Sequence, residues 1–166
     1  KRLAKLGHRI IWLAAPNPTV TEDTALKTLA LELSQRADAS ERLARIVYVS
    51  TTGVYGDARG NWLDERSAVQ PQSTRAMRRG RAEKQLQQAF RRVAIKASIV
   101  RAPGIYSATR LPTERLRNAI PALKAEEDSY SNHIHETDLA RISYLSAYKS
   151  RAFDIINAVD KAPMRM

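Results

Sequence analysis

Short apolar runs alternate along the chain with longer stretches in which apolar residues recur every three or four positions. The runs cover residues 9–15, 45–51, 93–100 and 153–159. Apolar runs of this length, rich in β-branched residues, predict strands. The run 45–51 lacks strict alternation of polar and apolar residues, which is typical of a strand that is covered on both faces.

The stretches between the runs predict helices over residues 21–37, 73–92, 112–118 and 137–149. Thr21 and Glu22 suit the first turn of the first helix, and Thr137 or Asp138 is expected to cap the last one. The positions expected to face a core are Ala25, Leu26, Leu29, Ala30 and Leu33 in the first helix, Met77, Leu86, Ala89 and Phe90 in the second, and Leu139, Ile142, Leu145 and Tyr148 in the last.

Strands that alternate with helices predict an α/β fold with a parallel sheet and helices on both of its faces. The sequence contains no internal repeat, low-complexity tract or interdomain linker. A length of 166 residues is enough for one hydrophobic core. We therefore expect residues 1–166 to form a single domain.

Composition narrows the class of protein. The chain has no cysteine, which excludes disulfide bonds, thiolate catalysis and cysteine-based zinc sites. No apolar run approaches the roughly 20 residues of a membrane span, and no apolar segment follows the basic residues 1–7 as it would in a signal peptide. We therefore expect a cytoplasmic protein without a membrane segment.

The formal net charge of +11 raises nucleic-acid binding as one hypothesis. The basic residues are nevertheless spread along the sequence and interrupted by acids, and zinc-finger, basic-zipper and ribonucleoprotein patterns are missing from it. The one dense cluster consists of Arg75, Arg78, Arg79, Arg81 and Lys84. A solvated surface or a site for an anionic ligand is the favoured interpretation of this charge.

Five segments together resemble the extended short-chain dehydrogenase/reductases, also called the NAD-dependent epimerase/dehydratase family. They are WLAAP at 12–16, VYVSTTGVYG at 47–56, RAPGIY at 101–106, IHETDLA at 134–140, and the segment 157–163. They occur in the family's order with compatible spacing. The details are most similar to an atypical branch often described as nucleoside-diphosphate-sugar epimerases.

The resemblance implies a Rossmann-like fold, an NAD or NADP cofactor, and a small-molecule substrate such as a nucleotide sugar. It also implies a homodimer, because members of the family often pair through helices. Thr51 matches a hydroxyl that orients the substrate, and Tyr55 and His135 match positions at the substrate pocket. The positions that match the cofactor site are Ala14, Ala15, Pro16, Ser50, Pro103, Gly104, Ile105 and Tyr106.

The chain departs from the family at the cofactor end. The family opens with a strand and a Gly-x-x-Gly-x-x-Gly loop, which lets the backbone approach the pyrophosphate. The sequence contains no such loop, and residues 1–10 resemble the end of the first helix and the start of the second strand. Ile11 then resembles the start of the fourth strand. We therefore expect that part of the N-terminal half is missing near Ile10 and Ile11, and that residues are missing at both ends.

The second departure is catalytic. The family uses a Tyr-x-x-x-Lys pair on the helix after this turn, in which the tyrosine exchanges a proton with the substrate. Glu83 matches an acidic residue eight positions after the tyrosine, which places Arg75 in the tyrosine position and Arg79 in the lysine position. An arginine cannot donate a proton near neutral pH. The resemblance therefore assigns Thr51, Arg75 and Arg79 to the catalytic positions while putting the usual chemistry in question.

Each candidate residue also has a structural interpretation. Arg75, Arg78 and Arg79 share one helix face and would either meet an anionic ligand or form a solvated basic surface. Thr51 could be a plain polar strand end, and Tyr55 could pack under the turn. A metal site at His133 and His135 is conceivable but not favoured.

Three function hypotheses remain open. The first is an NAD(P)-binding reductase-like or epimerase-like protein. The second is a non-catalytic dinucleotide sensor or scaffold. The third is a basic nucleic-acid-binding module.

Overall fold

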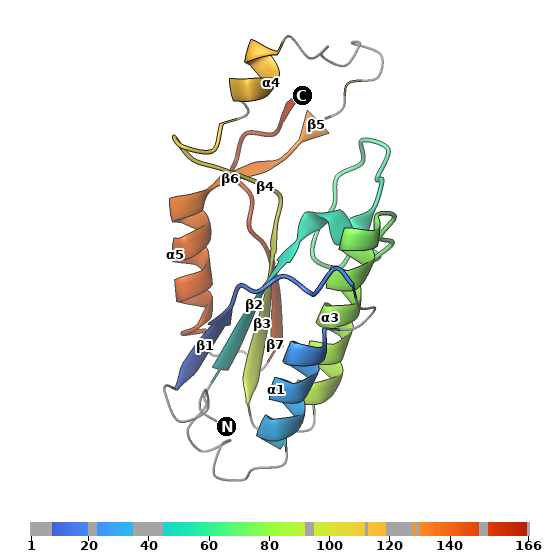
Figure 1. Ribbon diagram of the computed structural model, residues 1–166, viewed down its shortest axis with the longest axis vertical. Helices are drawn as coiled ribbons and strands as arrows, with labels where there is room; N and C mark the ends of the chain where they lie inside the picture. The colour runs from blue at the N-terminus through green and yellow to red at the C-terminus, as the bar shows by residue number, and fades with distance from the viewer. Residues whose placement is uncertain are drawn as a thin grey trace.

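The computed structural model describes residues 8–19, 23–34, 45–91, 95–111, 113–118, 128, 130–149 and 153–165. A sheet of four parallel strands runs through its centre in the order β1-β2-β3-β7 (Figure 1). These strands are β1 (Arg9–Trp12), β2 (Arg45–Thr51), β3 (Lys96–Ala102) and β7 (Phe153–Asn157). The predicted parallel α/β sheet is confirmed.

Helices cover both faces of this sheet, as Figure 1 shows, with α1 and α3 on one face and α5 on the other. The helices are α1 (Thr24–Ser34), the 3-10 helix η2 (Thr52–Tyr55), α3 (Thr74–Phe90), α4 (Thr113–Arg117) and α5 (Glu136–Ser146). Two small sheets lie beyond the carboxyl ends of the central strands. They pair β4 (Gly104–Tyr106) with β6 (His133–His135), and β5 (Tyr130–Ser131) with β8 (Met164–Arg165).

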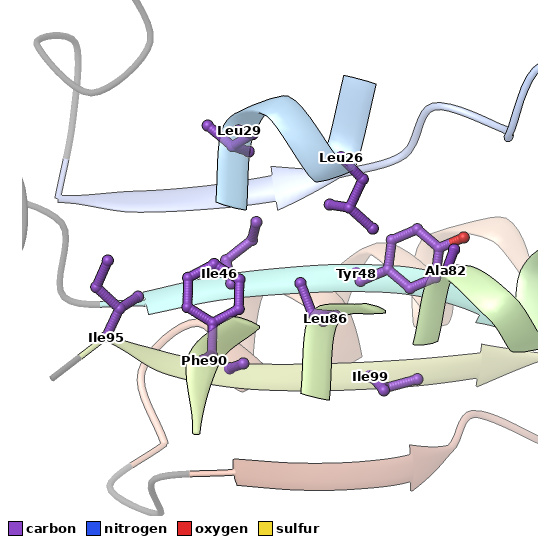
Figure 2. Packing of buried hydrophobic residues seen from close by; sticks show 10 residues of the cluster. Leu26, Leu29, Ile46, Tyr48, Ala82, Leu86, Phe90, Ile95 and Ile99 are labelled. Carbon is purple, nitrogen blue, oxygen red and sulfur yellow. The ribbon is translucent and has the colours of Figure 1, made fainter. Parts of the chain in front are cut away.

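The core is divided by the sheet into two hydrophobic clusters. Successive side chains of a strand point to opposite faces, so Ile46 and Tyr48 join the cluster under α1 and α3, whereas Val47 and Val49 join the one under α5. Figure 2 shows the first cluster, in which Leu26 and Leu29 of α1 and Leu86 and Phe90 of α3 pack over β2 and β3. Both faces of β2 are therefore buried, as its unbroken apolar run predicted.

Two predicted apolar stripes are wrong in part. Met77 is exposed because it lies nine positions before Leu86, about two and a half turns away on the opposite side of α3. Leu145 and Tyr148 are exposed for a related reason. The predicted positions on α5 are spaced three residues apart, but a helical turn takes 3.6 residues, so each step turns further away from the buried face. The buried stripe of α5 instead continues from Leu139 through Ser143 and Ser146. Ala25 is exposed as well. The predictions for the side chains of Ala30 and Leu33 lie outside what the structure describes.

The helix starts also correct the sequence analysis. His135, rather than Thr137 or Asp138, caps α5, because its Nδ1 accepts a hydrogen bond of 3.2 Å from the amide of Thr137. Helix α1 begins at Thr24, where Asp23 accepts a hydrogen bond of 2.9 Å from the amide of Leu26. Thr21 and Glu22 lie outside the described residues. Among the helices that the structure describes, none is long and apolar enough to cross a membrane.

Candidate functional site

A cavity of about 1400 Å³ lies at the carboxyl ends of β2, β3 and β7. Its wall includes Thr51 at the end of β2, Pro103 directly after β3, and Asn157 at the end of β7. Ligands of open parallel α/β sheets bind in the crevice outside these strand ends. A volume of this size is ample for a small organic ligand.

The turn after β2 forms the floor of this cavity. The hydroxyl of Thr51 accepts a hydrogen bond of 3.2 Å from the amide of Gly53 and so caps η2. Gly56 ends η2 with a φ of 75°, and a Cβ atom there would lie 2.1 Å from the carbonyl oxygen of Gln70. Only glycine fits this close approach without strain. The Gly-Val-Tyr-Gly segment therefore sets the course of the chain around the cavity.

A buried polar network lies directly behind the floor. Arg101 and Glu83 are each 2% exposed, and the Nη2 of Arg101 donates to the Oε2 of Glu83 at 2.7 Å. The hydroxyl of Ser50 donates to the Oε1 of Glu83 at 2.5 Å. Burial disfavours the charged guanidinium, but the bonds to Glu83 and Tyr55 outweigh it and raise the pKa of Arg101. The guanidinium of Arg101 therefore stays charged within the core, with its N–H groups bonded to Glu83 and Tyr55.

This network fixes Tyr55 in the cavity wall. The Nη1 of Arg101 donates to the phenol oxygen of Tyr55 at 2.8 Å, and the phenol donates to the Oδ1 of Asn157 at 2.8 Å. Tyr55 is 6% exposed and lines the cavity. Tyr55 therefore packs under the turn, as its structural interpretation expected, and also borders the cavity.

Sequence reasoning missed this network, although signals for it were present. Ser50 and Arg101 are polar residues that follow apolar residues within the two central strands. The register of the sheet places Ser50 beside Arg101, and Arg101 beside Asn157. Glu83 was used only to count positions along α3, whereas its carboxylate is what joins the helix to the two strands.

The three arginines predicted to share one face of α3, namely Arg75, Arg78 and Arg79, have different environments. Arg75 is exposed and lines the cavity. Arg79 reaches across the sheet edge and donates to the carbonyl oxygen of Val49 at 2.9 Å, the phenol of Tyr48 at 3.1 Å and the carbonyl oxygen of Ala14 at 3.4 Å. Arg78 donates to the carbonyl oxygen of Pro18 at 3.2 Å. Arg79 is therefore bound within the protein, and Arg75 is the member of the trio whose side chain borders the cavity.

The positions matched by resemblance fall into two groups. Thr51, Tyr55, Arg75, Pro103, Gly104 and Ile105 line the cavity. The others lie beside or behind it: Ser50 is buried against Glu83, Ala14 meets Arg79, Ala15 is exposed, and Pro16 is buried. Tyr106 and His135 pair across β4 and β6, with their rings edge to face at 5.3 Å.

A loop over residues 57–72 forms the outer wall. The Oε1 of Glu65 accepts a hydrogen bond of 2.8 Å from the amide of Asn157, which joins the loop to the end of β7. Asp64 accepts hydrogen bonds from the hydroxyl of Ser67 at 3.0 Å and the amide of Arg66 at 2.9 Å. These bonds, that of Ser67 first, lower the pKa of Asp64 and keep it a carboxylate. The sequence analysis assigned this segment no role.

The histidines do not gather with other metal ligands. In the portion of the chain that the structure describes, no group of three or more His, Cys, Asp or Glu side chains could hold a metal ion. The ring of His133 instead lies against Gly104, where an added Cβ would be 2.9 Å from its Cδ2 atom. His135 serves as the helix cap.

Solved structures with the same fold span more sequence than this chain. A conserved protein of unknown function from Silicibacter pomeroyi has 26% identity and a TM-score of 0.77, with 94% of this chain and 52% of that chain covered. The UDP-glucuronic acid 4-epimerase of Bacillus cereus in complex with NAD has 15% identity and a TM-score of 0.80, with 99% and 57% covered. The UDP-glucose 4-epimerase of Thermotoga maritima with UDP-glucose has 16% identity and a TM-score of 0.73, with 95% and 57% covered. The chain thus spans little more than half the length of these structures.

Comparison with curated proteins gives no match to the sequence. The model of the NAD dependent epimerase/dehydratase family matches residues 2–155, nearly the whole chain. This match agrees with the parallel sheet, the cavity at its carboxyl edge and the turn after β2. The chain belongs to the NAD dependent epimerase/dehydratase family.

Proposed function

We propose that the cavity binds a nucleotide sugar beside an NAD-type cofactor, and that it does so without the tyrosine-dependent chemistry of the family. The observation that carries this proposal is the convergence of Thr51, Tyr55 and Arg75 with the backbone of residues 103–105 in one cavity. A UDP sugar is the natural candidate, since the epimerase of Thermotoga maritima holds UDP-glucose in a related fold.

The residues present fit one end of a dinucleotide. Thr51, Pro103, Gly104 and Ile105 lie together at the strand ends and would border the nicotinamide of NAD or NADP. When bound, such a cofactor supplies a hydride acceptor or donor. The sequence holds no Gly-x-x-Gly-x-x-Gly segment, so these residues do not by themselves provide a cradle for the pyrophosphate.

Arg75 and Arg79, at the positions of the family's catalytic pair, support binding rather than proton transfer. Arg75 offers five N–H donors in a fixed fork, which suits a phosphate or carboxylate, but it cannot exchange a proton near neutral pH. The guanidinium of Arg79 already donates hydrogen bonds to the carbonyl oxygens of Val49 and Ala14 and to the phenol of Tyr48. The protein therefore acts as a binding relative of the epimerases, a nucleotide-sugar or dinucleotide sensor, or it uses chemistry that needs no tyrosine.

Calorimetric titration with UDP-glucose tests this proposal. We expect Arg75→Ala to weaken binding by about tenfold, the usual effect of losing one charge-assisted hydrogen bond. Arg91→Ala removes an exposed arginine at the far end of α3 and should leave the affinity unchanged. A wild-type protein that binds no UDP sugar would overturn the proposal.

A further inference from the structure

Trp62 is the most exposed large apolar side chain that the structure describes. Its exposed fraction is 88%, and it lines the cavity from the loop over residues 57–72, which follows η2 in Figure 1. Tryptophan is highly buried on average and is enriched among the residues that carry binding energy, so an exposed ring in a cavity wall is a candidate binding contact. The structure of the loop explains how the ring is held there.

Hydrogen bonds fix the loop on both sides of Trp62 without burying the ring. Before it, the amide of Asn61 donates to the carbonyl oxygen of Ala58 at 3.0 Å. After it, Glu65 accepts from the amide of Asn157 at 2.8 Å. Further on, the amide of Gln70 donates to the carbonyl oxygen of Val54 at 2.9 Å. These bonds hold the loop backbone on both sides of Trp62 in place before a ligand binds, which lowers the entropy that the loop must lose on binding.

The polar groups around Trp62 select the part of a ligand that can lie there. Asn61, Asp64 and Glu65 belong to the same wall, and the pKa of Asp64 is lowered by its bonds to Ser67 and Arg66. Carboxylates repel a phosphate but accept hydrogen bonds from hydroxyl groups. The guanidinium groups of Arg75 and Arg110, which attract phosphate, belong to other parts of the lining, on α3 and after β4.

We infer that Trp62 stacks on the hexose ring of a nucleotide sugar, with the neighbouring carboxylates and amide receiving its hydroxyl groups. This inference rests on the proposed function and adds to it a sugar-binding loop and its central residue. The face of an indole ring is electron-rich and attracts the C–H groups on one face of a pyranose. A nucleobase at Trp62 would leave the carboxylates without hydroxyl partners.

The test compares UDP-glucose with UDP, which lacks the hexose. Trp62→Ala should weaken UDP-glucose about tenfold in calorimetry and leave the affinity for UDP unchanged. Trp62→Phe keeps an aromatic face and should restore most of the loss. The melting temperature should stay the same, because the ring contributes little buried surface in the free protein.

The second tryptophan provides a matched control and a spectroscopic signal. The chain holds two tryptophans, and Trp12 packs against the cluster under α1 and α3, away from the cavity. Trp12→Phe should bind UDP-glucose normally, and its fluorescence then reports Trp62 alone. UDP-glucose should change that emission while UDP should not.

The outcomes separate the inference from the proposed function. If Trp62→Ala weakens UDP as much as UDP-glucose, the ring holds the base and the inference is wrong. If the variant binds both as the wild type does, Trp62 has no binding role, while the proposed function stands. If neither compound binds the wild-type protein, the proposed function fails and the inference fails with it.

Discussion

Glu83 and Arg101 place a full charge pair inside the core, which the fold tolerates because every neighbouring polar group is used. Ser50 and Tyr55 complete the hydrogen bonds of the pair, and Asn157 accepts the proton of the phenol. Such a pair is weak evidence for stability in itself, but removing one partner strands the other charge. The network therefore also fixes the side of the cavity on which Tyr55 lies.

We expect Glu83→Gln to lower the free energy of unfolding by about 3–5 kcal/mol, because Arg101 would keep a buried charge without its partner. Urea denaturation measures this loss. The exposed pair of Arg141 and Asp138, 3.1 Å apart, gives a matched control, and Asp138→Asn should change the stability very little. Equal losses of stability in Glu83→Gln and Asp138→Asn would contradict the claim that burial makes the pair of Glu83 and Arg101 matter more than an exposed pair.

Tyr48 predicts a loss of stability in alkali. Burial raises its pKa above the ordinary value of 10.0, although the bond from Arg79 opposes this rise. The unfolded chain then releases the phenol proton at a lower pH than the folded chain, so unfolding becomes more favourable as the pH rises above about 10. Between pH 8 and 10.5 the wild type should lose more stability than Tyr48→Phe, by at most about 0.8 kcal/mol. Parallel stability curves for the two proteins would rule this out.

At the scale of elements, the turn after β2 joins the sheet to the cavity. Gly56 and Gly60 both have positive φ, 75° and 77°, but only Gly56 faces the Gln70 carbonyl, whereas a Cβ at Gly60 meets open space. Gly60→Ala should therefore cost about 1 kcal/mol from backbone strain alone. Gly56→Ala should lower the stability clearly more and displace the loop. Thermal unfolding would measure the loss of stability, and near-ultraviolet circular dichroism would report the displaced surroundings of Trp62. A smaller effect at Gly56 than at Gly60 would disprove this account.

The sequence predicted those elements whose signal is local. The run of β2 was placed to the residue, because seven consecutive positions are buried or nearly so and leave no ambiguity. The stripes of α3 and α5 were less certain, since apolar residues such as Met77 and Leu145 occur on both sides of these helices. Periodicity alone could not choose between them.

The candidate site could be predicted only where it follows from the family motifs. Thr51, Tyr55 and Pro103 were expected there and line the cavity. The network of Glu83 and the anchoring of Trp62 depend on strand register and on loop bonds between distant residues, such as Glu65 and Asn157. The polar residues within the strands are visible in the sequence, but no pattern along the chain shows which distant residues they meet.

At the scale of the whole molecule, part of the positive charge is bound within the protein. Arg45 and Arg101 are buried, and Arg78 and Arg79 bind carbonyl oxygens of the loop after β1. The cavity at the carboxyl edge of the sheet, with Arg75 in its wall, is the feature that ties the molecule to its family.

The most direct test of this account is an amide NMR titration of the isotope-labelled protein with UDP-glucose. The account predicts shifts concentrated on Thr51, Gly53, Gly104 and Ile105 and on the indole N–H of Trp62, which all border the cavity. The outer face of α5, including Tyr144, should remain unchanged. A spectrum that does not respond to UDP-glucose, or shifts confined to α5, would contradict the central claim that this cavity binds a nucleotide sugar.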